Sequence, residues 1–330
     1  RLRDMGKPIT FVEAITEGLR EELQRDEDVF LLGQDIGAYG GAFGVTKGLV
    51  DEFGAKRVWD TPLSETAIIG NAIGAAMYGL RPVAEMQFAD FVACGFNQLV
   101  NNAAKMHYRW GPNVPMVVRL PWGGGVSGGP FHSGCMEAWF LNVPGLKLVC
   151  PSTPRDAKAA IKAAIRDDNP VLYFEHKHMY RDPKLRQEVG EVEPLELGKA
   201  RIAREGRDAT VVTFGIMVHY AEHAAENLAK EGIEVEVLDL LSLRPYDTEA
   251  ILASVRKTNR ALVVNEATLM GSVAGEYASF ISEHCFEDLD APVMRMGALE
   301  CPIPYAPELE QRMLPNTQKI EDALRKLVAF

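Results

Sequence analysis

Long apolar runs, redox-type cysteine pairs and an excess of basic residues are all missing from this sequence. No apolar run approaches the roughly 18 residues that a membrane span needs, so we do not expect a membrane protein. Lys and Arg number 35 against 46 Asp and Glu, and the net charge of −11 argues against nucleic-acid binding, which needs clustered cations. The five cysteines are scattered without a Cys-x-x-Cys pair, which indicates reduced thiols.

The first residues carry no recognisable targeting segment. Arg1 to Pro8 contains two arginines with no apolar stretch behind them, so we predict neither a signal peptide nor a transit peptide. Together with the reduced thiols, this predicts a cytoplasmic location rather than the mitochondrial matrix.

Short β-branched runs alternate with helical stretches along the whole chain of 330 residues. Several runs lack polar alternation, which is typical of strands covered on both faces. We therefore predict an α/β fold with mainly parallel sheets. The expected strands are Val29–Gly33, Pro82–Gln87, Val114–Leu120, Leu146–Cys150, Val171–Glu175, Ala209–Phe214, Val235–Asp239 and Ala261–Asn265, and the expected helices are Phe11–Arg25, Glu65–Gly79, Phe91–Tyr108, Pro154–Arg166, Met217–Glu231 and Thr248–Lys257.

One segment interrupts this alternation. Between about Tyr180 and Gly206 the sequence is polar, contains proline and is rich in Glu, Lys and Arg, and the alternation resumes at Ala209. This predicts two domains, residues 1–190 and residues 191–330.

The helix that begins near Glu65 is unusually rich in small residues. Each glycine in a helix lowers its propensity, so something must approach this helix closely, either within one domain or from another subunit. Ser64 is the expected N-cap, and Glu65 lies in the first turn, where a glutamate ordinarily complements the helix dipole. The small residues are Ala67, Gly70, Ala72, Gly74, Ala75, Ala76 and Gly79.

A glycine-rich segment follows the expected strand at Val114–Leu120. Gly123 to Gly128 matches the pattern G-x-G-x-x-G, which would allow an NAD-dependent dehydrogenase, but that motif must open a helix directly. Here Pro130 and its neighbours continue a loop. We favour a flexible loop that presents His132, because histidine is easily tuned for proton transfer near neutral pH.

The other histidines carry weaker signals. His219 and His223 are four residues apart, but they do not form H-E-x-x-H, so a solvated helix face is favoured over a zinc site. His176 and His178 alternate at a strand end and are expected to be ordinary loop residues.

Many short motifs follow one another in order along nearly the whole chain. They are Asp60–Glu65, Gly79–Val83, Gln87–Phe91, Pro144–Lys147, Pro151–Pro154, Ala164–Pro170, Phe174–Lys177, Gly232–Ile233, Arg244–Pro245 and Pro302–Tyr305. Together they resemble the beta subunits of the thiamine-diphosphate-dependent decarboxylating component of 2-oxo acid dehydrogenase complexes. The resemblance implies a thiamine-diphosphate pyrimidine-binding domain followed by a transketolase-type C-terminal domain.

The resemblance implies a role for each of several residues. Glu65 would hydrogen-bond the cofactor's aminopyrimidine at N1′ and so promote its activation, and His132 would serve the substrate and lipoyl proton transfers. Phe91 would lie beside the pyrimidine. The remaining cofactor neighbours implied by position are Gln34, Leu63, Ser64 and Gln87.

A structural potassium ion is also implied by the resemblance. Its site would be built largely of carbonyl oxygens, which suit a hard cation. The matching residues are Met116, Ala164, Ile165, Asp167 and Asn169.

Partners follow from what the chain lacks relative to this family. The Mg²⁺ that holds the diphosphate is bound through Gly-Asp-Gly, and that sequence does not occur from Arg1 to Phe330. We therefore expect the Mg²⁺ on an alpha subunit, in a two-fold symmetric heterotetramer. The resemblance also implies docking of a lipoyl acyltransferase on the C-terminal domain, where we expect Glu300 and Glu310 to contribute charge.

The substrate is left open by the sequence. Gln87–Phe91 favours branched-chain 2-oxo acids, while Glu137–Phe140 and Val143–Gly145 favour acetoin and pyruvate. Gln34 stands where the family usually has Glu, and Gly134 follows Ser133 where Gln is usual. A non-catalytic scaffold remains an alternative from another class.

Overall fold

The computed structural model describes residues 8–330. The expectation about Arg1 to Pro8 lies outside these residues, apart from Pro8 itself. The chain forms two compact units. One comprises the residues up to Trp122 together with Asn142–Leu197, and the other comprises Gly123–Leu141 together with Gly198–Phe330. The glycine-rich segment therefore groups with the second half of the chain.

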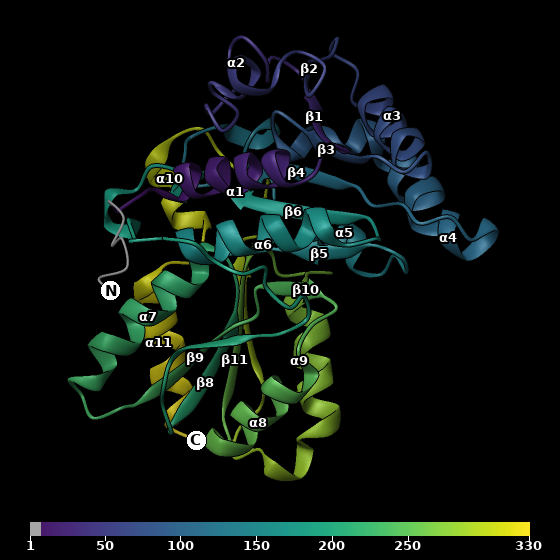
Figure 1. Cartoon of the computed structure of the whole chain (residues 1–330). Coiled ribbons are helices and arrows are strands. Elements are labelled where there is room, and N and C mark those ends of the chain that lie inside the picture. Colours follow the sequence, from purple (N-terminus) through teal and green to yellow (C-terminus); the bar gives the residue numbers. More distant parts are fainter. Residues whose placement is uncertain (1–7) are drawn as a thin grey trace, which may run out of the picture. The chain divides into compact units, whose positions relative to one another are not determined.

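The first unit is built on a parallel sheet (Figure 1). Its strands lie in the order β5-β6-β4-β3-β1-β2, and the central β4 and β6 are buried along their full length. The strands are β1 (Val29–Gly33), β2 (Val58–Asp60), β3 (Arg81–Glu85), β4 (Val117–Trp122), β5 (Lys147–Val149) and β6 (Val171–His176), and the helices are α1 (Phe11–Arg25), α2 (Leu49–Phe53), α3 (Glu65–Met77), η1 (Ala89–Gly95), η2 (Gln98–Ala103), α4 (Ala104–Trp110), α6 (Pro154–Arg166), η4 (Lys177–Met179) and η5 (Pro183–Leu185).

Two helices, α1 and α6, lie side by side in this unit (Figure 1). Each begins at a threonine N-cap: Thr10 forms a capping box with Glu13, and Thr153 accepts from the backbone of Asp156. Lys158 of α6 is buried and pairs with carboxylates of α1, which compensates for its removal from water. Both helices have the bounds that the sequence predicts.

The second unit contains a sheet of order β12-β11-β8-β9-β7, in which only β7 is antiparallel to its neighbour. Helices α7 and α11 cover one face and α8 and α9 the other (Figure 1). The strands are β7 (Arg201–Arg204), β8 (Ala209–Thr213), β9 (Val235–Asp239), β10 (Ser242–Arg244), β11 (Ala261–Thr268) and β12 (Met294–Ala298), and the helices are η3 (Gly129–Phe131), α5 (Ala138–Leu141), α7 (Ile216–Ala229), α8 (Thr248–Thr258), α9 (Val273–His284), η6 (Phe286–Asp288), α10 (Pro307–Met313) and α11 (Thr317–Val328).

The predicted α/β class with mainly parallel sheets is confirmed, and several local expectations are corrected. Phe91–Tyr108 is helical throughout, as predicted, but it is not one regular α-helix: η1 is a 3-10 helix, η2 is a π-helix and α4 is an α-helix. His176 is not a loop residue: it ends β6, fully buried, with its ring edge-on to Trp122 at 5.3 Å. No helix within residues 8–330 is both long and apolar enough to cross a bilayer.

Candidate functional site

The cofactor residues implied by the sequence follow the carboxyl ends of three adjacent parallel strands. Gln34 follows β1, Gln87 follows β3, and Leu63 to Glu65 come shortly after β2. Gly33 is in register with Asp60 of β2 and with Glu85 of β3, so the three strands end at the same edge of the sheet. This edge is where open parallel sheets carry ligand sites.

Glu65 lies half-buried in the first turn of α3. Its nearest recorded polar partner is the amide of Gln34, whose Nε2 donates to Glu65 Oε1 at 3.4 Å. The Gln34 side chain is buried. Ser64 occupies the N-cap position as expected, but its side chain makes no capping hydrogen bond with the described residues, which corrects that detail.

The start of α3 is joined to the segment that carries Phe91. The Thr66 hydroxyl donates to the Cys94 carbonyl at 2.5 Å. A Cβ on Gly95 would lie 2.3 Å from Ile69 Cδ1, so η1 packs directly on α3 because residue 95 has no side chain. Phe91 is half-buried in η1. The fold thus brings the segments of Glu65 and Phe91 together.

The other two cofactor neighbours differ in exposure. Gln87 is half-buried, and its Nε2 donates to Asp35 at 3.1 Å. Asp35 has a φ of 55°, a left-handed conformation that few non-glycine residues adopt. Leu63 is 78 % exposed, so within this chain its side chain has almost no apolar cover.

The small residues of α3 divide between two faces. Ala72 and Ala76 are buried, whereas a Cβ on Gly70 or on Gly74 would meet none of the described atoms within 4 Å. Packing among residues 8–330 therefore does not account for these two glycines. Of the two explanations that the sequence allowed, this geometry supports contact with another subunit.

Arg81 occupies the neighbourhood implied for potassium. Its Nη1 donates to the carbonyls of Ile165 at 3.0 Å and Asp167 at 3.2 Å, and its Nη2 donates to Asp168 at 2.7 Å. The Met116 carbonyl accepts from Val171 N at 2.9 Å. The Asp167 carboxylate accepts from both the backbone and the side chain of Asn169, and Ala164 is buried.

Three backbone donors of the glycine-rich loop are already engaged by carboxylates. Gly124 N donates to Glu266 Oε1 at 2.5 Å, Gly125 N to Glu310 Oε1 at 2.8 Å and Ser127 N to Glu310 Oε2 at 3.0 Å. Phosphate would have to displace two carboxylates of the same unit. These contacts weaken the NAD alternative, because the three donors are already engaged within the second unit.

His132 follows the short η3 turn, and its side chain is half-buried. Its own backbone N donates to the Gly129 carbonyl at 3.4 Å. Farther along the same segment, Ser133 is fully buried, and the Gly134 carbonyl accepts from Gly123 N at 3.3 Å. Gly134, which stands where the family usually has Gln, thus takes part through its backbone in a hydrogen bond that joins the two ends of this segment.

Glu137, a residue that the sequence did not single out for catalysis or binding, is fully buried in the second unit. Neither of its carboxylate oxygens has a hydrogen-bond partner among the described residues. Burial raises the pKa of Glu137 to about 7, and the nearby Glu266 carboxylate adds to the rise. The Cys135 thiol also donates a hydrogen bond to Glu266, with 3.7 Å between Sγ and Oε1.

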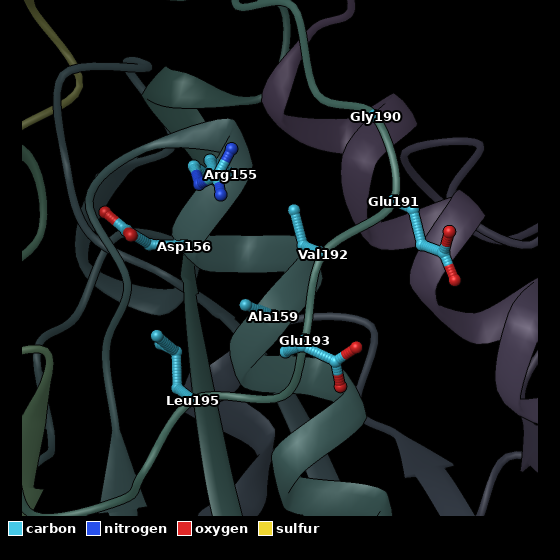
Figure 2. A pocket seen from close by; sticks show the side chains of 8 residues that line it. All are labelled: Arg155, Asp156, Ala159, Gly190, Glu191, Val192, Glu193 and Leu195. Carbon is cyan, nitrogen blue, oxygen red and sulfur yellow. The ribbon is translucent and has the colours of Figure 1, made fainter. Parts of the chain in front are cut away.

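A cavity of about 790 Å³ lies elsewhere in the first unit. Figure 2 shows its lining, which includes Arg155 and Asp156 of α6 and the chain from Gly190 to Leu195. Asp156 is already engaged at the N-terminus of α6 by Thr153. The cavity shares no residue with the candidate site.

The two units match two known domain families. Residues 7–183 match the model of the transketolase pyrimidine binding domain, and residues 198–320 match that of the transketolase C-terminal domain. A curated protein, the 2-oxoisovalerate dehydrogenase subunit beta of Bacillus subtilis (strain 168), is 50 % identical over 98 % of this chain and 99 % of its own length.

The chain belongs to the family of 2-oxo acid dehydrogenase beta subunits. Other members of the family include the pyruvate dehydrogenase E1 component subunit beta of the same Bacillus strain, 42 % identical over 98 % of this chain and 99 % of that protein. The acetoin:2,6-dichlorophenolindophenol oxidoreductase subunit beta of that strain is 41 % identical over 98 % of each chain.

A solved structure shares the fold of this beta subunit. It is described as a split gene transketolase, inactive beta4 tetramer, and it covers 97 % of this chain and 99 % of its own, with a TM-score of 0.78 and 23 % identity. The two domain types implied by the sequence are confirmed, as is the family of oxidoreductases.

Proposed function

We propose that this beta subunit supplies the pyrimidine-binding half of a thiamine-diphosphate site and that Glu65 is its essential acid–base residue. The observation that carries the proposal is the half-buried Glu65 at the start of α3, with a buried amide donor from Gln34. A carboxylate in that position can hold a proton against a ring nitrogen.

The residues around Glu65 suit an aminopyrimidine. Phe91 offers an aromatic face and Leu63 a largely exposed apolar side chain, while Gln87 and Ser64 add polar groups. Thiamine diphosphate, when bound, supplies a thiazolium that accepts the electrons released on decarboxylation of a 2-oxo acid. Glu65 would bind the pyrimidine nitrogen N1′, and Gln34 would orient Glu65.

We assign the other half of the site to an alpha subunit. Gly-Asp-Gly is absent from the sequence, so the Mg²⁺ ligands must come from another chain. The uncovered small-residue face of α3 supports close approach of a second chain there. A two-fold symmetric heterotetramer is the simplest closed assembly of two alpha and two beta subunits.

Branched-chain 2-oxo acids are the substrates that we propose. The relative named for 2-oxoisovalerate is 50 % identical, against 42 % for the one named for pyruvate and 41 % for the one named for acetoin. His132 would serve proton transfer to substrate and to the lipoyl group. The acyl group would pass to the lipoamide of an acyltransferase component.

Two further features remain proposals. The carbonyls near Arg81 have a second lone pair each, so a potassium ion could still share them beside the guanidinium, whose charge Asp168 offsets. We also propose that the acyltransferase docks on the second domain. The proposed location of the complex is the cytoplasm. Glu310 is buried and engaged within the chain, so it cannot contribute to that surface as expected, whereas Glu300 is exposed.

The experiment that tests the proposed function is an assay of the reconstituted alpha–beta pair. Turnover of 2-oxoisovalerate, pyruvate and acetoin would be followed with an artificial electron acceptor. We expect activity with all components present and the largest kcat/KM for the branched-chain acid. Absence of turnover with every 2-oxo acid would refute the proposed function. A preference for pyruvate would refute only the assignment of branched-chain 2-oxo acids as substrates.

A further inference from the structure

The loop that leads to His132 is fastened at its start by two carboxylates. The backbone N–H groups of Gly124, Gly125 and Ser127 all donate to carboxylate oxygens of Glu266 and Glu310, at 2.5 to 3.0 Å. Glu310 binds two of the three, one with each oxygen. Hydrogen bonds to an ionised acceptor are about twice as strong as those between neutral groups.

The conformation of this loop needs such support. Gly123 and Gly125 have φ values of 86° and 76°, and Ser127, which has a side chain, has a φ of 56°. A non-glycine residue in this region is strained by roughly 1–3 kcal/mol and persists only where its surroundings hold it. The clustered N–H groups are satisfied here by side chains and not by a strand or helix.

Glu310 is buried in a segment that packs against the rest of the second unit. Its side chain is 3 % exposed, and it lies in α10 shortly before Met313 and Leu314, which pack with Ala298 in one apolar cluster. A Cβ on Gly124 would come within 2.9 Å of Leu314 and 3.2 Å of Glu310 Oε1. The loop therefore lies directly on α10.

Tyr305, just before α10, makes a second contact with the loop, at Gly129 shortly before His132. A Cβ on Gly129 would come within 2.2 Å of the Tyr305 ring, so the η3 turn packs directly against that side chain. Tyr305 comes just before Ala306, the N-cap of α10. Residues 305–314 thus contact the loop both at its beginning and at the turn that ends at His132.

We propose that Glu310 is a positioning residue, which fixes the Gly123–Ser127 segment and through it sets the placement of His132. The inference rests on the proposed function, in which His132 serves the substrate. Glu266 shares the role at Gly124, but Glu310 is the better test because it holds two donors and is not part of the pair with Glu137. Glu310 contacts backbone of the loop only and is not itself a catalytic residue.

The test compares Glu310→Gln with Glu308→Gln, a control that removes the same charge from an exposed position of the same helix. The amide introduced by Glu310→Gln would turn a donor toward one of the two N–H groups. We expect hydrogen exchange at Gly125 and Ser127 to accelerate at least tenfold in Glu310→Gln only. In the alpha–beta pair, kcat should fall roughly 10- to 100-fold, as misplacement of a reacting group does.

A His132→Ala background separates positioning from general stability. If Glu310 acts through His132, adding Glu310→Gln to His132→Ala should lower kcat no further, because coupled residues are non-additive. A further loss as large as that in the wild-type background would overturn the proposal. Unchanged loop exchange in Glu310→Gln would overturn it as well.

The exchange measurement also separates this inference from the proposed function. It needs no turnover, so it tests the carboxylate contacts even in a complex that decarboxylates no 2-oxo acid. Should Glu310→Gln fail to fold, the wild-type chain still decides: its Gly125 and Ser127 amides should exchange at least tenfold more slowly than in an unstructured peptide. Exchange at the unstructured rate would contradict the proposal.

Discussion

At the scale of single residues, the chemistry of Glu65 depends on what faces it. The side chain of Gln34 presents an amide donor, so no second carboxylate approaches the Glu65 oxygen from that direction. Gln34, which stands where the family usually has Glu, therefore removes a negative charge and donates a hydrogen bond to Glu65. Glu65 is left as an acceptor at the edge of the sheet, partly exposed to an incoming ligand.

The first prediction concerns Glu65→Gln. The variant should fold and assemble, because the amide oxygen of a glutamine at position 65 can still accept from Gln34, but loss of proton transfer should lower kcat by roughly 10² to 10⁴. Turnover of the alpha–beta pair measures this, with exposed Glu27→Gln as control. Near-wild-type turnover in Glu65→Gln would show that the residue has no catalytic role and would favour the scaffold alternative.

The second prediction concerns pH and Glu137. Between its ordinary pKa of 4.5 and about 7, the folded chain holds a proton on Glu137 that the unfolded chain has lost. The folded state binds more protons, so the free energy of unfolding falls as pH rises through this window, by roughly 3 kcal/mol in all. Above pH 7 the folded chain stays destabilised by this full amount, because Glu137 is then ionised while buried.

Glu137→Gln should remove that fall, because a neutral amide does not titrate. Urea unfolding at pH 5 and pH 8 measures the effect, and the variant should gain stability over wild type at pH 8 only. Exposed Glu283→Gln serves as control. The same pH dependence in Glu137→Gln and wild type would contradict the account of this buried carboxyl.

At the scale of elements, α3 has one face against its own unit and one face uncovered. Ile68, Ile69 and Ala72 pack inward, while Gly70 and Gly74 lie on the side where a Cβ meets no described atom. Nearby exposed aromatic and aliphatic side chains include Tyr78 at 94 % and Met77 at 40 %. An apolar, small-residue face of this kind suits burial against another helix.

The third prediction tests that face. Gly74→Leu should leave the chain folded, since a Cβ there meets no described atom, but it should weaken assembly with the alpha subunit on the order of 100-fold. Size-exclusion chromatography and a binding titration measure assembly. Ser279→Leu, at an exposed position of α9, is the matched control. Undiminished assembly of Gly74→Leu would place the interface elsewhere.

Elements with a strong local pattern were predictable from sequence, and those fixed by distant contacts were not. Helices α1 and α6 have clear threonine caps and apolar periodicity, and their bounds match the prediction to the residue. The segment Phe91–Tyr108 is patterned as one α-helix, but Gly95 must approach α3, and the chain up to that residue is a 3-10 helix. Nothing local signals that approach.

The candidate site divides in the same way. The residues at the sheet edge could be predicted from motifs that lie close in sequence, such as Asp60–Glu65. The carboxylates that hold the His132 loop could not, because Glu310 follows Ser127 by 183 residues. From the sequence alone, Glu310 is expected to contribute charge to a docking surface, which requires an exposed side chain. Only the tertiary structure reveals that the side chain is buried.

At the scale of the whole molecule, we propose that the beta subunit supplies one half of a catalytic site and a surface suited to meet the other half. Its sheet edge carries Glu65, Gln34 and Gln87, and its second unit carries the His132 loop. No Gly-Asp-Gly occurs in its sequence. The account therefore holds that neither cofactor binding nor decarboxylation belongs to this chain alone.

Calorimetric titration with thiamine diphosphate and Mg²⁺ tests this claim most directly. The purified beta chain and the reconstituted alpha–beta pair would be titrated under the same conditions. We predict no measurable heat of binding at micromolar cofactor for the beta chain alone and saturable binding for the pair, with one cofactor per beta chain. Micromolar binding to the beta chain by itself would contradict the account.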